Sequence, residues 1–285
     1  MQTVSSLQQN ILADRSELFI FSDGPKGEHD ISQVQAVRDY LHTISGFNHI
    51  TIIESAINKG LAESIVNGVT QVINEYGSVI VLEDDLLLAP NFLVFMNAAL
   101  VKYENKPMVH SISGFIFDIP GSGNYPYDIF FTRRHCSWGW AIWRDRWNEI
   151  DWEVIDYKEF DRSSAKQTAF NGIGSDLTSM LNKQMTGKLD SWAIRCIYHQ
   201  FKNGTYTVYP LTSKVVNIGF GEGATHTHFR FNKYDTTIDK GEKIEFCFPD
   251  EIFEDKWLIK QFKQKYSLLT RLYYYALNRL FKTAS

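Results

Sequence analysis

The chain has 285 residues, 44% hydrophobic and 22% charged, which is typical of a globular protein that buries a sizeable core. Its formal net charge of −4 gives no general attraction to nucleic acid, and its three cysteines lack metal-ligand spacing, as in a reduced cytoplasmic protein. The first residues do not have the pattern of a signal peptide and no apolar run is long enough to span a bilayer, so we expect a cytoplasmic protein or one peripheral on the inner face of the cell membrane.

Short β-rich runs alternate with helical patterns over the first two-thirds of the chain. Strands are predicted at 17–23, 49–55, 78–85 and 108–117, and helices at 61–77 and 90–103. This alternation is typical of a doubly wound α/β fold, so we predict a mostly parallel sheet flanked by helices. Without a repeat or a low-complexity linker, we expect one domain over residues 1–234, followed by a C-terminal extension over residues 235–285.

Three adjacent acids, Glu83, Asp84 and Asp85, end one of the most apolar runs of the chain. In open α/β sheets, ligands bind beyond the carboxyl ends of the strands. Because side chains alternate along a strand, Glu83 and Asp85 are expected on one side and Asp84 on the other. Carboxylate oxygens suit Mg²⁺ and similar hard cations, so the triplet indicates either a metal site or a plain acidic turn between a strand and a helix.

The wider sequence resembles the GT-A glycosyltransferases. Four stretches carry the resemblance in the order of that family, and they are "FIFSDGPKG" (19–27), "NKGLAESIVNGV" (58–69), "VIVLEDDLLLAPNFL" (79–93) and "CSWGWAIWRDRW" (136–147). Two more, "KLDSWAIRC" (188–196) and "NIGFGEGATHTH" (217–228), extend it. The chain is similar to family 2-like bacterial sugar transferases and, more distantly, to N-acetylglucosaminyltransferase I. The resemblance implies a GT-A (Rossmann-like) fold and a nucleotide-sugar donor.

The resemblance also implies a metal ion, Mn²⁺ or Mg²⁺, that bridges the two phosphates of the donor. Asp85, the last acid of the triplet, would ligate it, and the metal would stabilise the charge of the nucleoside diphosphate leaving group. His226 is a candidate third ligand, because a neutral imidazole suits such ions. His228 is an alternative ligand, and His226 also fits an ordinary surface position.

Donor contacts are implied for other residues of the same stretches. Glu83 and Asp84 would contact the hydroxyl groups of the ribose and the sugar. Asp23 matches the family acid that reads the nucleotide base, although an Asp before Gly24 also fits a residue that shapes a turn.

A tryptophan-rich stretch matches the family segment that lines the sugar pocket. In it, Trp138, Gly139 and Trp140 are assigned to the pocket, where glycine would let a ligand approach the backbone and the indole faces would pack on a pyranose ring. Trp140, Trp143 and Trp147 recur at i, i+3 and i+7, which predicts one face of a helix. We expect Trp143 and Trp147 to lie in the core.

An inverting transfer needs a carboxylate that accepts the proton of the acceptor hydroxyl. Asp190 is the predicted base, with Asp176 as the fallback. The match to the distant relative is shifted by one residue, because its base falls where this chain has Ser191. Asp190 or Ser191 also suits the N-cap of the helix predicted next.

The opening strand of the family, with its nucleotide-contacting turn, has no counterpart in this sequence. In the family that strand lies in the middle of the sheet. Its absence predicts either exposed edges on its neighbours or another segment in its place.

The C-terminal stretch 256–285 holds seven Lys or Arg residues and no Asp or Glu. Its apolar side chains are predicted near one face of a single helix, and they are Leu258, Phe262, Leu269, Leu272, Tyr273, Ala276 and Leu280. A basic amphipathic helix is typical of contact with a membrane surface. The alternatives are a helix packed on the domain and pairing with the acid-rich stretch 235–255.

These observations predict a metal-dependent inverting glycosyltransferase of the hexosyltransferase type, with a basic C-terminal helical extension. The expected donor is a nucleotide sugar, with a UDP-sugar favoured, and the acceptor is a saccharide or a lipid-linked saccharide in cell-surface polysaccharide synthesis. A degenerate domain that binds a sugar or a partner without turnover is the main alternative. A sugar nucleotidyltransferase is a further one, although no Gly-rich basic triphosphate loop is visible near the start.

Overall fold

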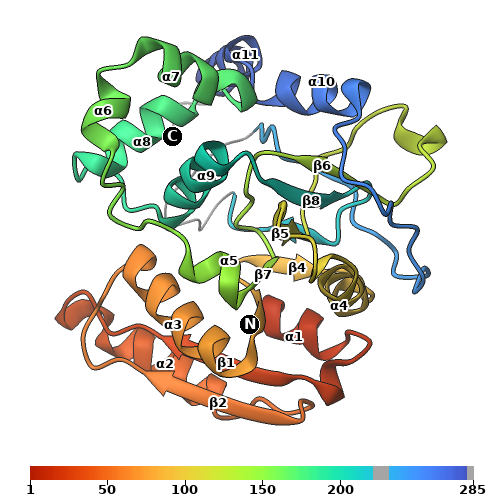
Figure 1. Cartoon of the computed structure of the whole chain (residues 1–285). Coiled ribbons are helices and arrows are strands. Elements are labelled where there is room, and N and C mark those ends of the chain that lie inside the picture. The colour runs from red at the N-terminus through yellow and green to blue at the C-terminus, as the bar shows by residue number, and fades with distance from the viewer. Residues whose placement is uncertain (221–230, 281–285) are drawn as a thin grey trace.

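The computed structural model describes residues 1–220 and 231–280 and shows a mixed α/β protein (Figure 1). Its α-helices are α1 (Gln2–Gln8), α2 (Ile31–Leu41), α3 (Leu61–Tyr76), α4 (Phe92–Tyr103), α5 (Arg144–Asn148), α6 (Tyr157–Asp161), α7 (Ser164–Phe170), α8 (Leu177–Met185), α9 (Trp192–Asn203), α10 (Lys256–Lys265) and α11 (Leu268–Leu280). Its strands are β1 (Glu17–Ser22), β2 (His49–Glu54), β3 (Ser78–Val81), β4 (Leu86–Leu88), β5 (Val109–Ser113), β6 (Ile129–Thr132), β7 (Trp140–Trp143), β8 (Tyr206–Pro210) and β9 (Val215–Asn217). Short 3₁₀ turns are η1 (Ala13–Arg15), η2 (Glu28–Asp30), η3 (Ser122–Asn124) and η4 (Asn171–Ile173).

The strands form three sheets. The largest has five strands in the order β3-β7-β5-β8-β6, and only its β5–β8 pair is parallel. β1 and β2 form a parallel pair, and β4 and β9 form an antiparallel pair. The predicted α/β class is confirmed, but the expected mostly parallel sheet is not. No α-helix lies between β5 and β6 or between β6 and β7, so this part of the chain lacks the strand–helix–strand units from which a parallel sheet is built.

The core lies on both faces of the five-stranded sheet. Every residue of β5, β6 and β7 is buried, and α4 covers one face while α3 and α9 cover the other. Alternate residues of β7 point to opposite faces: Ala141 and Trp143 pack on the α4 side, and Trp140 and Ile142 on the α3–α9 side.

The expected burial of Trp143 and Trp147 is confirmed, since they are 4% and 1% exposed. The predicted helical face is wrong, because Trp140 and Trp143 belong to strand β7 and only Trp147 is helical.

The parallel pair β1–β2 is less deeply buried than the five-stranded sheet. Neither strand has a buried residue, although α3 contacts β1 as well as β3. Leu18 and Ile80 pack against the edge of the main core, and Phe21 lies against Gly68 of α3. β1 pairs only with β2, and β3 only with β7, so within residues 1–220 and 231–280 each has one edge without a strand partner.

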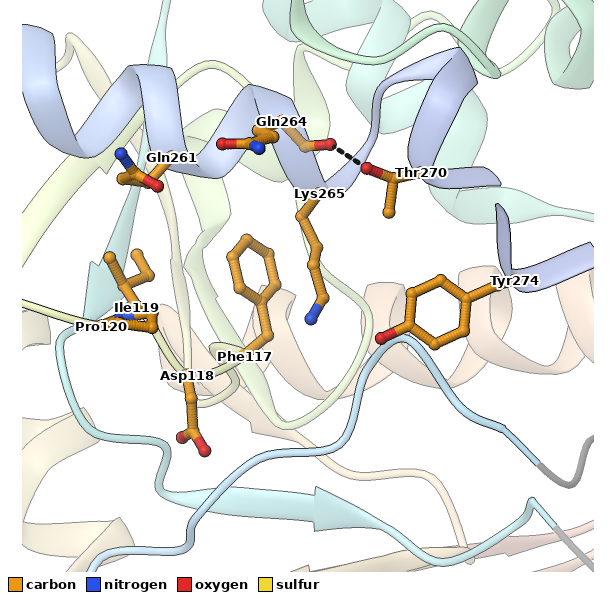
Figure 2. Close-up of a pocket in the computed structure, with 9 residues that line it drawn as sticks. All are labelled: Phe117, Asp118, Ile119, Pro120, Gln261, Gln264, Lys265, Thr270 and Tyr274. Atoms are coloured by element: carbon orange, nitrogen blue, oxygen red, sulfur yellow. Dashed lines mark hydrogen bonds between the residues drawn. The ribbon is translucent and has the colours of Figure 1, made fainter. Parts of the chain in front are cut away.

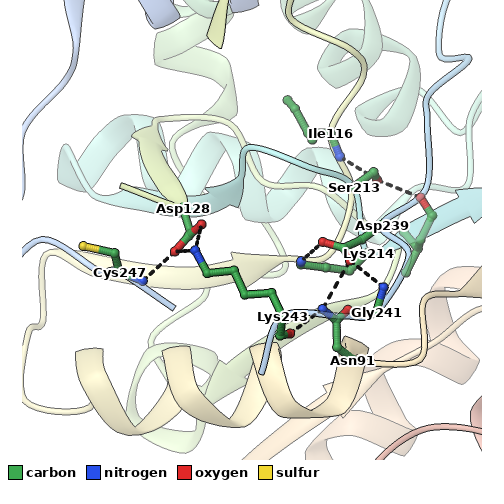
Figure 3. A network of polar contacts seen from close by, with 10 residues as sticks. Asn91, Ile116, Asp128, Ser213, Lys214, Asp239, Gly241, Lys243 and Cys247 are labelled. Atoms are coloured by element: carbon green, nitrogen blue, oxygen red, sulfur yellow. Dashed lines mark hydrogen bonds and ion pairs between the residues drawn. The ribbon is translucent and has the colours of Figure 1, made fainter. Parts of the chain in front are cut away.

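The acid-rich stretch after residue 234 is fastened to the body by a polar network (Figure 3). Lys214 forms an ion pair with Asp239, and Lys243 forms one with Asp128 at 2.6 Å. Asn91 at the start of α4 donates to the backbone oxygen of Lys243 at 2.7 Å. These pairs do not involve the basic residues of α10 or α11, so they do not support the alternative in which the two stretches neutralise each other.

The basic C-terminal stretch forms two helices. Leu258 and Phe262 of α10 are buried in the main core, whereas α11 has no buried residue. Ser267 starts the second helix, because its hydroxyl accepts a hydrogen bond from the Thr270 N–H at 3.2 Å. The prediction of one helix with one apolar face is therefore wrong. No helix in the described ranges is long and apolar enough to cross a membrane.

Candidate functional site

The acidic triplet lies in the turn between β3 and β4, just beyond the carboxyl end of β3. Glu83 and Asp85 are partly buried, and Asp84 is exposed. Thr3 of α1 donates to the backbone oxygen of Asp84 at 2.7 Å and accepts from the Leu86 N–H at 3.1 Å. The first helix therefore holds the turn in place.

Asp85 keeps one carboxylate oxygen without a partner. Asn217 Nδ2 donates to Asp85 Oδ2 at 3.0 Å, whereas Oδ1 is buried and accepts no hydrogen bond from the described residues. Burial raises the pKa of Asp85, which the Asn217 bond partly offsets. Gly219 lies so close that a Cβ there would be 2.3 Å from Oδ2. A buried oxygen of this kind fits a cation ligand, because a hard cation would satisfy it.

Glu83 has the most strongly shifted carboxyl group of the triplet. Burial, together with the charges of Asp85 and Asp84, raises the pKa of Glu83 to about 8, while a hydrogen bond from the Trp192 side chain lowers it. At neutral pH the isolated carboxyl is therefore largely protonated and can both donate and accept hydrogen bonds.

Trp140 supports this arrangement from the core. It has no exposed surface and stacks on Trp192 with ring centroids 4.7 Å apart. The prediction that Trp140 lines a sugar pocket is therefore corrected: on β7 its side chain faces α3 and α9, where it positions Trp192 below Glu83.

Asp23 organises a turn at the end of β1. Its carboxylate accepts hydrogen bonds from the backbone N–H groups of Gly24 and Lys59 at 2.9 Å and of Gly60 at 3.0 Å, and from Asn58 Nδ2 at 3.0 Å. Gly60 has a positive φ of 81°, which glycine adopts without strain. Of the two sequence interpretations, the geometry favours the turn, because these bonds occupy most of the acceptor capacity of the carboxylate.

Asp190 lies at the N-terminus of α3. Its Oδ2 accepts a hydrogen bond from the Ala62 N–H at 3.2 Å, and a Cβ on Gly60 would be 3.3 Å from the same oxygen. Ser191 is the N-cap of α9, since its hydroxyl accepts from the Ile194 N–H at 3.4 Å. The exposed carboxylate of Asp190 is therefore not used by that cap.

The fallback residue Asp176 is fully engaged elsewhere. Arg134 donates two hydrogen bonds to it, at 3.0 and 2.8 Å. Burial by itself would raise the pKa of Asp176, but the charge and hydrogen bonds of Arg134 outweigh it and hold the pKa below its ordinary value. A carboxylate in this state is a poor general base, so Asp176 is not supported as the fallback.

Trp138 and Gly139 precede β7. Trp138 is partly exposed, and its ring packs against Tyr234 with centroids 5.2 Å apart. Gly139 has a φ of 59°, and a Cβ there would be 2.8 Å from Val215 Cγ1. Glycine is thus needed for the close approach of β9, which carries Asn217 to Asp85.

The remaining predicted ligand, His226, and its alternative, His228, lie outside the described residues. Within the described residues, no group of three or more His, Cys, Asp or Glu side chains is placed to hold a metal ion. Asp85 is therefore the metal-ligand candidate whose geometry can be seen.

Two supporting residues were not recognised from the sequence. Asn217 and Trp192 bond to the acids of the triplet from β9 and α9. The only signal for Asn217 was its place before a Gly-rich stretch.

The Asp23 turn and Asp190 meet at the N-terminus of α3, and Trp192, two residues after Asp190, bonds to Glu83 of the acidic turn. Such a cluster can hold a cation and provide hydrogen-bonding groups and a free carboxylate. A scan against models of protein families gives no match, and a search of curated proteins gives none either.

Proposed function

We propose that the chain is a metal-dependent inverting glycosyltransferase with a GT-A (Rossmann-like) fold. It would transfer a sugar from a nucleotide-sugar donor, with a UDP-sugar favoured, to a saccharide or a lipid-linked saccharide. The observation that carries this proposal is the buried Oδ1 of Asp85, which has no hydrogen-bond partner among the described residues and lies in an acidic turn at the end of a β-strand. Such a position is where α/β proteins bind their ligands.

Asp85 would hold Mn²⁺ or Mg²⁺ through this oxygen. When bound, the cation supplies positive charge beside the diphosphate leaving group. Glu83, held by the Trp192 side chain, would contact the hydroxyl groups of the donor. Asp84 is exposed and would add a second, acceptor-only group.

Asp190 would take the proton of the attacking acceptor hydroxyl. Trp192, two residues along the chain, bonds to Glu83, so the start of α9 is tied to the acidic turn. The Ala62 N–H holds one oxygen of Asp190, which orients the carboxylate. A direct displacement with proton transfer to this group inverts the anomeric carbon.

The proposal is tested by thermal unfolding with UDP, GDP, CDP or dTDP, each with and without Mn²⁺. A ligand that binds only the folded state raises the midpoint, so we expect a rise that requires both one nucleotide and the metal. Asp85→Asn keeps the size of the side chain and removes its charge, and it should abolish the metal-dependent part of the rise.

A rise that is unchanged in Asp85→Asn would remove Asp85 from the site. If no nucleotide shifts the midpoint of the wild type, with or without Mn²⁺, the proposed function fails and a domain that binds a sugar or a partner without turnover becomes the better account.

A further inference from the structure

The last helix, α11, is attached to the body by its polar side. Side chains of this helix donate three hydrogen bonds to neighbouring segments, namely Thr270 Oγ1 to Gln264 O (2.7 Å), Arg271 Nη1 to Ser175 Oγ (3.2 Å) and Asn278 Nδ2 to Phe231 O (2.9 Å). Figure 2 shows Thr270 and Tyr274 turned toward the groove that α11 forms with α10 and residues 117–120. Thr270, Arg271 and Asn278 of α11 are therefore used for docking on the protein.

The apolar side of α11 faces outward. Its large apolar side chains are between 53% and 80% exposed, and they are Leu268, Leu269, Leu272, Tyr273, Tyr275 and Leu280. At about 100° per residue they fall within roughly half of the helix circumference. They form one continuous surface, here called the α11 apolar face.

This orientation is the reverse of that of an ordinary surface helix, which buries its apolar side and exposes its polar one. The neighbouring helix α10 has the ordinary orientation, with Leu258, Ile259 and Phe262 buried. An exposed apolar surface of this kind indicates contact with a partner protein or a membrane.

The charges around the α11 apolar face favour a membrane with anionic lipids. Residues 256–285 contain seven Lys or Arg and no Asp or Glu. Lys260 and Lys263 of α10 are exposed, and Arg279 lies on the same side of α11 as Leu268 and Leu272. Leucine and tyrosine on one side of a helix with basic residues around them are typical of a helix that lies in the plane of a lipid interface.

We propose that the α11 apolar face docks on the surface of an anionic lipid bilayer. The leucine and tyrosine side chains enter the headgroup region, and the basic residues contact the lipid charges. With 13 residues, α11 lies along the interface and does not span the bilayer. The inference is independent of the proposed function, because it requires neither a donor nor a metal.

The test is flotation of the full chain with vesicles of phosphatidylcholine alone and with vesicles that also contain phosphatidylglycerol. We expect clear binding to the anionic vesicles and weaker binding to the neutral ones. The variant Leu269→Ser/Leu272→Ser/Tyr273→Ser should lower the partition constant for anionic vesicles by about tenfold or more, because it removes three apolar side chains from the interface.

The matched control is Val101→Ser/Ile155→Ser, which removes apolar side chains that are 78% and 84% exposed on other elements. It should bind like the wild type. All the substituted side chains are exposed, so both variants should keep the wild-type unfolding midpoint, and this is checked before flotation.

Three results would overturn the proposal. They are no binding of the wild type to anionic vesicles, equal binding to neutral and anionic vesicles, and unchanged binding of the triple variant. If the wild type is a dimer that does not bind vesicles and the triple variant is a monomer, the α11 apolar face is assigned to contact with a second copy of the chain. No nucleotide is present in these experiments, so their failure is distinct from failure of the proposed transferase activity.

Discussion

The β1–β2 pair and the five-stranded sheet are built from similarly apolar segments, yet their burial differs completely. "ELFIFS" and "HITIIE" leave every residue at least partly exposed, whereas every residue of "VHSIS", "IFFT" and "WAIW" is buried. Among the described residues, β5 and β7 have a strand on each side, whereas β6, like β1, has one strand neighbour. β6 is nevertheless buried, because Phe130 packs on Phe262 of α10 and Phe131 packs on Tyr103 of α4. Burial therefore follows from the strands and side chains that cover a segment, not from its own hydrophobicity alone.

The largest test of this comparison truncates one apolar side chain in each region. Phe130→Ala in β6 should lower the free energy of unfolding by about 3–5 kcal/mol, because a fully buried ring leaves a cavity. Ile52→Ala in β2 should cost about 1 kcal/mol, since its side chain is only partly buried. Urea unfolding measures both values. Equal losses would mean that β1–β2 is as tightly packed as the large sheet.

A second, smaller test adds a methyl group in each region. Gly114→Ala places a Cβ 2.7 Å from the backbone oxygen of Gly139 and 2.8 Å from the ring of Phe92, so it should cost about 1–3 kcal/mol. Gly68→Ala in α3 places a Cβ 3.2 Å from the ring of Phe21, and the higher helix propensity of alanine offsets this contact. We expect a change within about 0.5 kcal/mol for Gly68→Ala. A large loss of stability in Gly68→Ala would show that the Phe21 ring of β1 cannot move to accommodate the added methyl group.

The last test is a pH dependence that belongs to the five-stranded sheet. Burial lowers the pKa of His135 to about 3, and its Nδ1 lies 3.0 Å from Ser111 Oγ of β5. Between pH 6.5 and 3 the unfolded chain then binds a proton that the folded chain does not. The contribution of His135 to stability is therefore lost as the pH falls, by up to about 1.4 kcal/mol per pH unit.

Glu83 acts in the opposite direction, because its pKa is raised to about 8 and the folded chain keeps its proton there. The measurement therefore compares urea unfolding at pH 7 and pH 5 in a Glu83→Gln background, with and without His135→Phe. We expect the stability lost between the two pH values to be smaller when His135 is replaced. Identical losses with and without the histidine would contradict its buried neutral state.

Several local elements follow directly from the sequence. The helix predicted at 61–77 is α3, which ends where Gly77 takes a positive φ of 83°. β1, β2 and β3 begin where their apolar runs begin. Hydrophobic periodicity and glycine at a helix end are local signals, so they predict structure without any knowledge of distant contacts.

Short apolar runs were less informative. "WAIW" fits both a helix and a strand, and its strand structure results from pairing with β3 and β5, which lie far away in the sequence. The antiparallel arrangement of β6 and β7 has the same origin.

At the candidate site, the sequence by itself determined that three acids follow a buried apolar run. Only the tertiary structure decided how deeply each acid is buried and which groups bond to it. Asn217 reaches Asp85 Oδ2 from 132 positions away, and Gly219 lies so close to the same oxygen that it leaves no room for a Cβ. The outward orientation of α11 was likewise decided by contacts of Arg271 and Asn278 with distant segments. Periodicity shows that a helix has two faces, but the partner that each face meets depends on the packing of the whole chain.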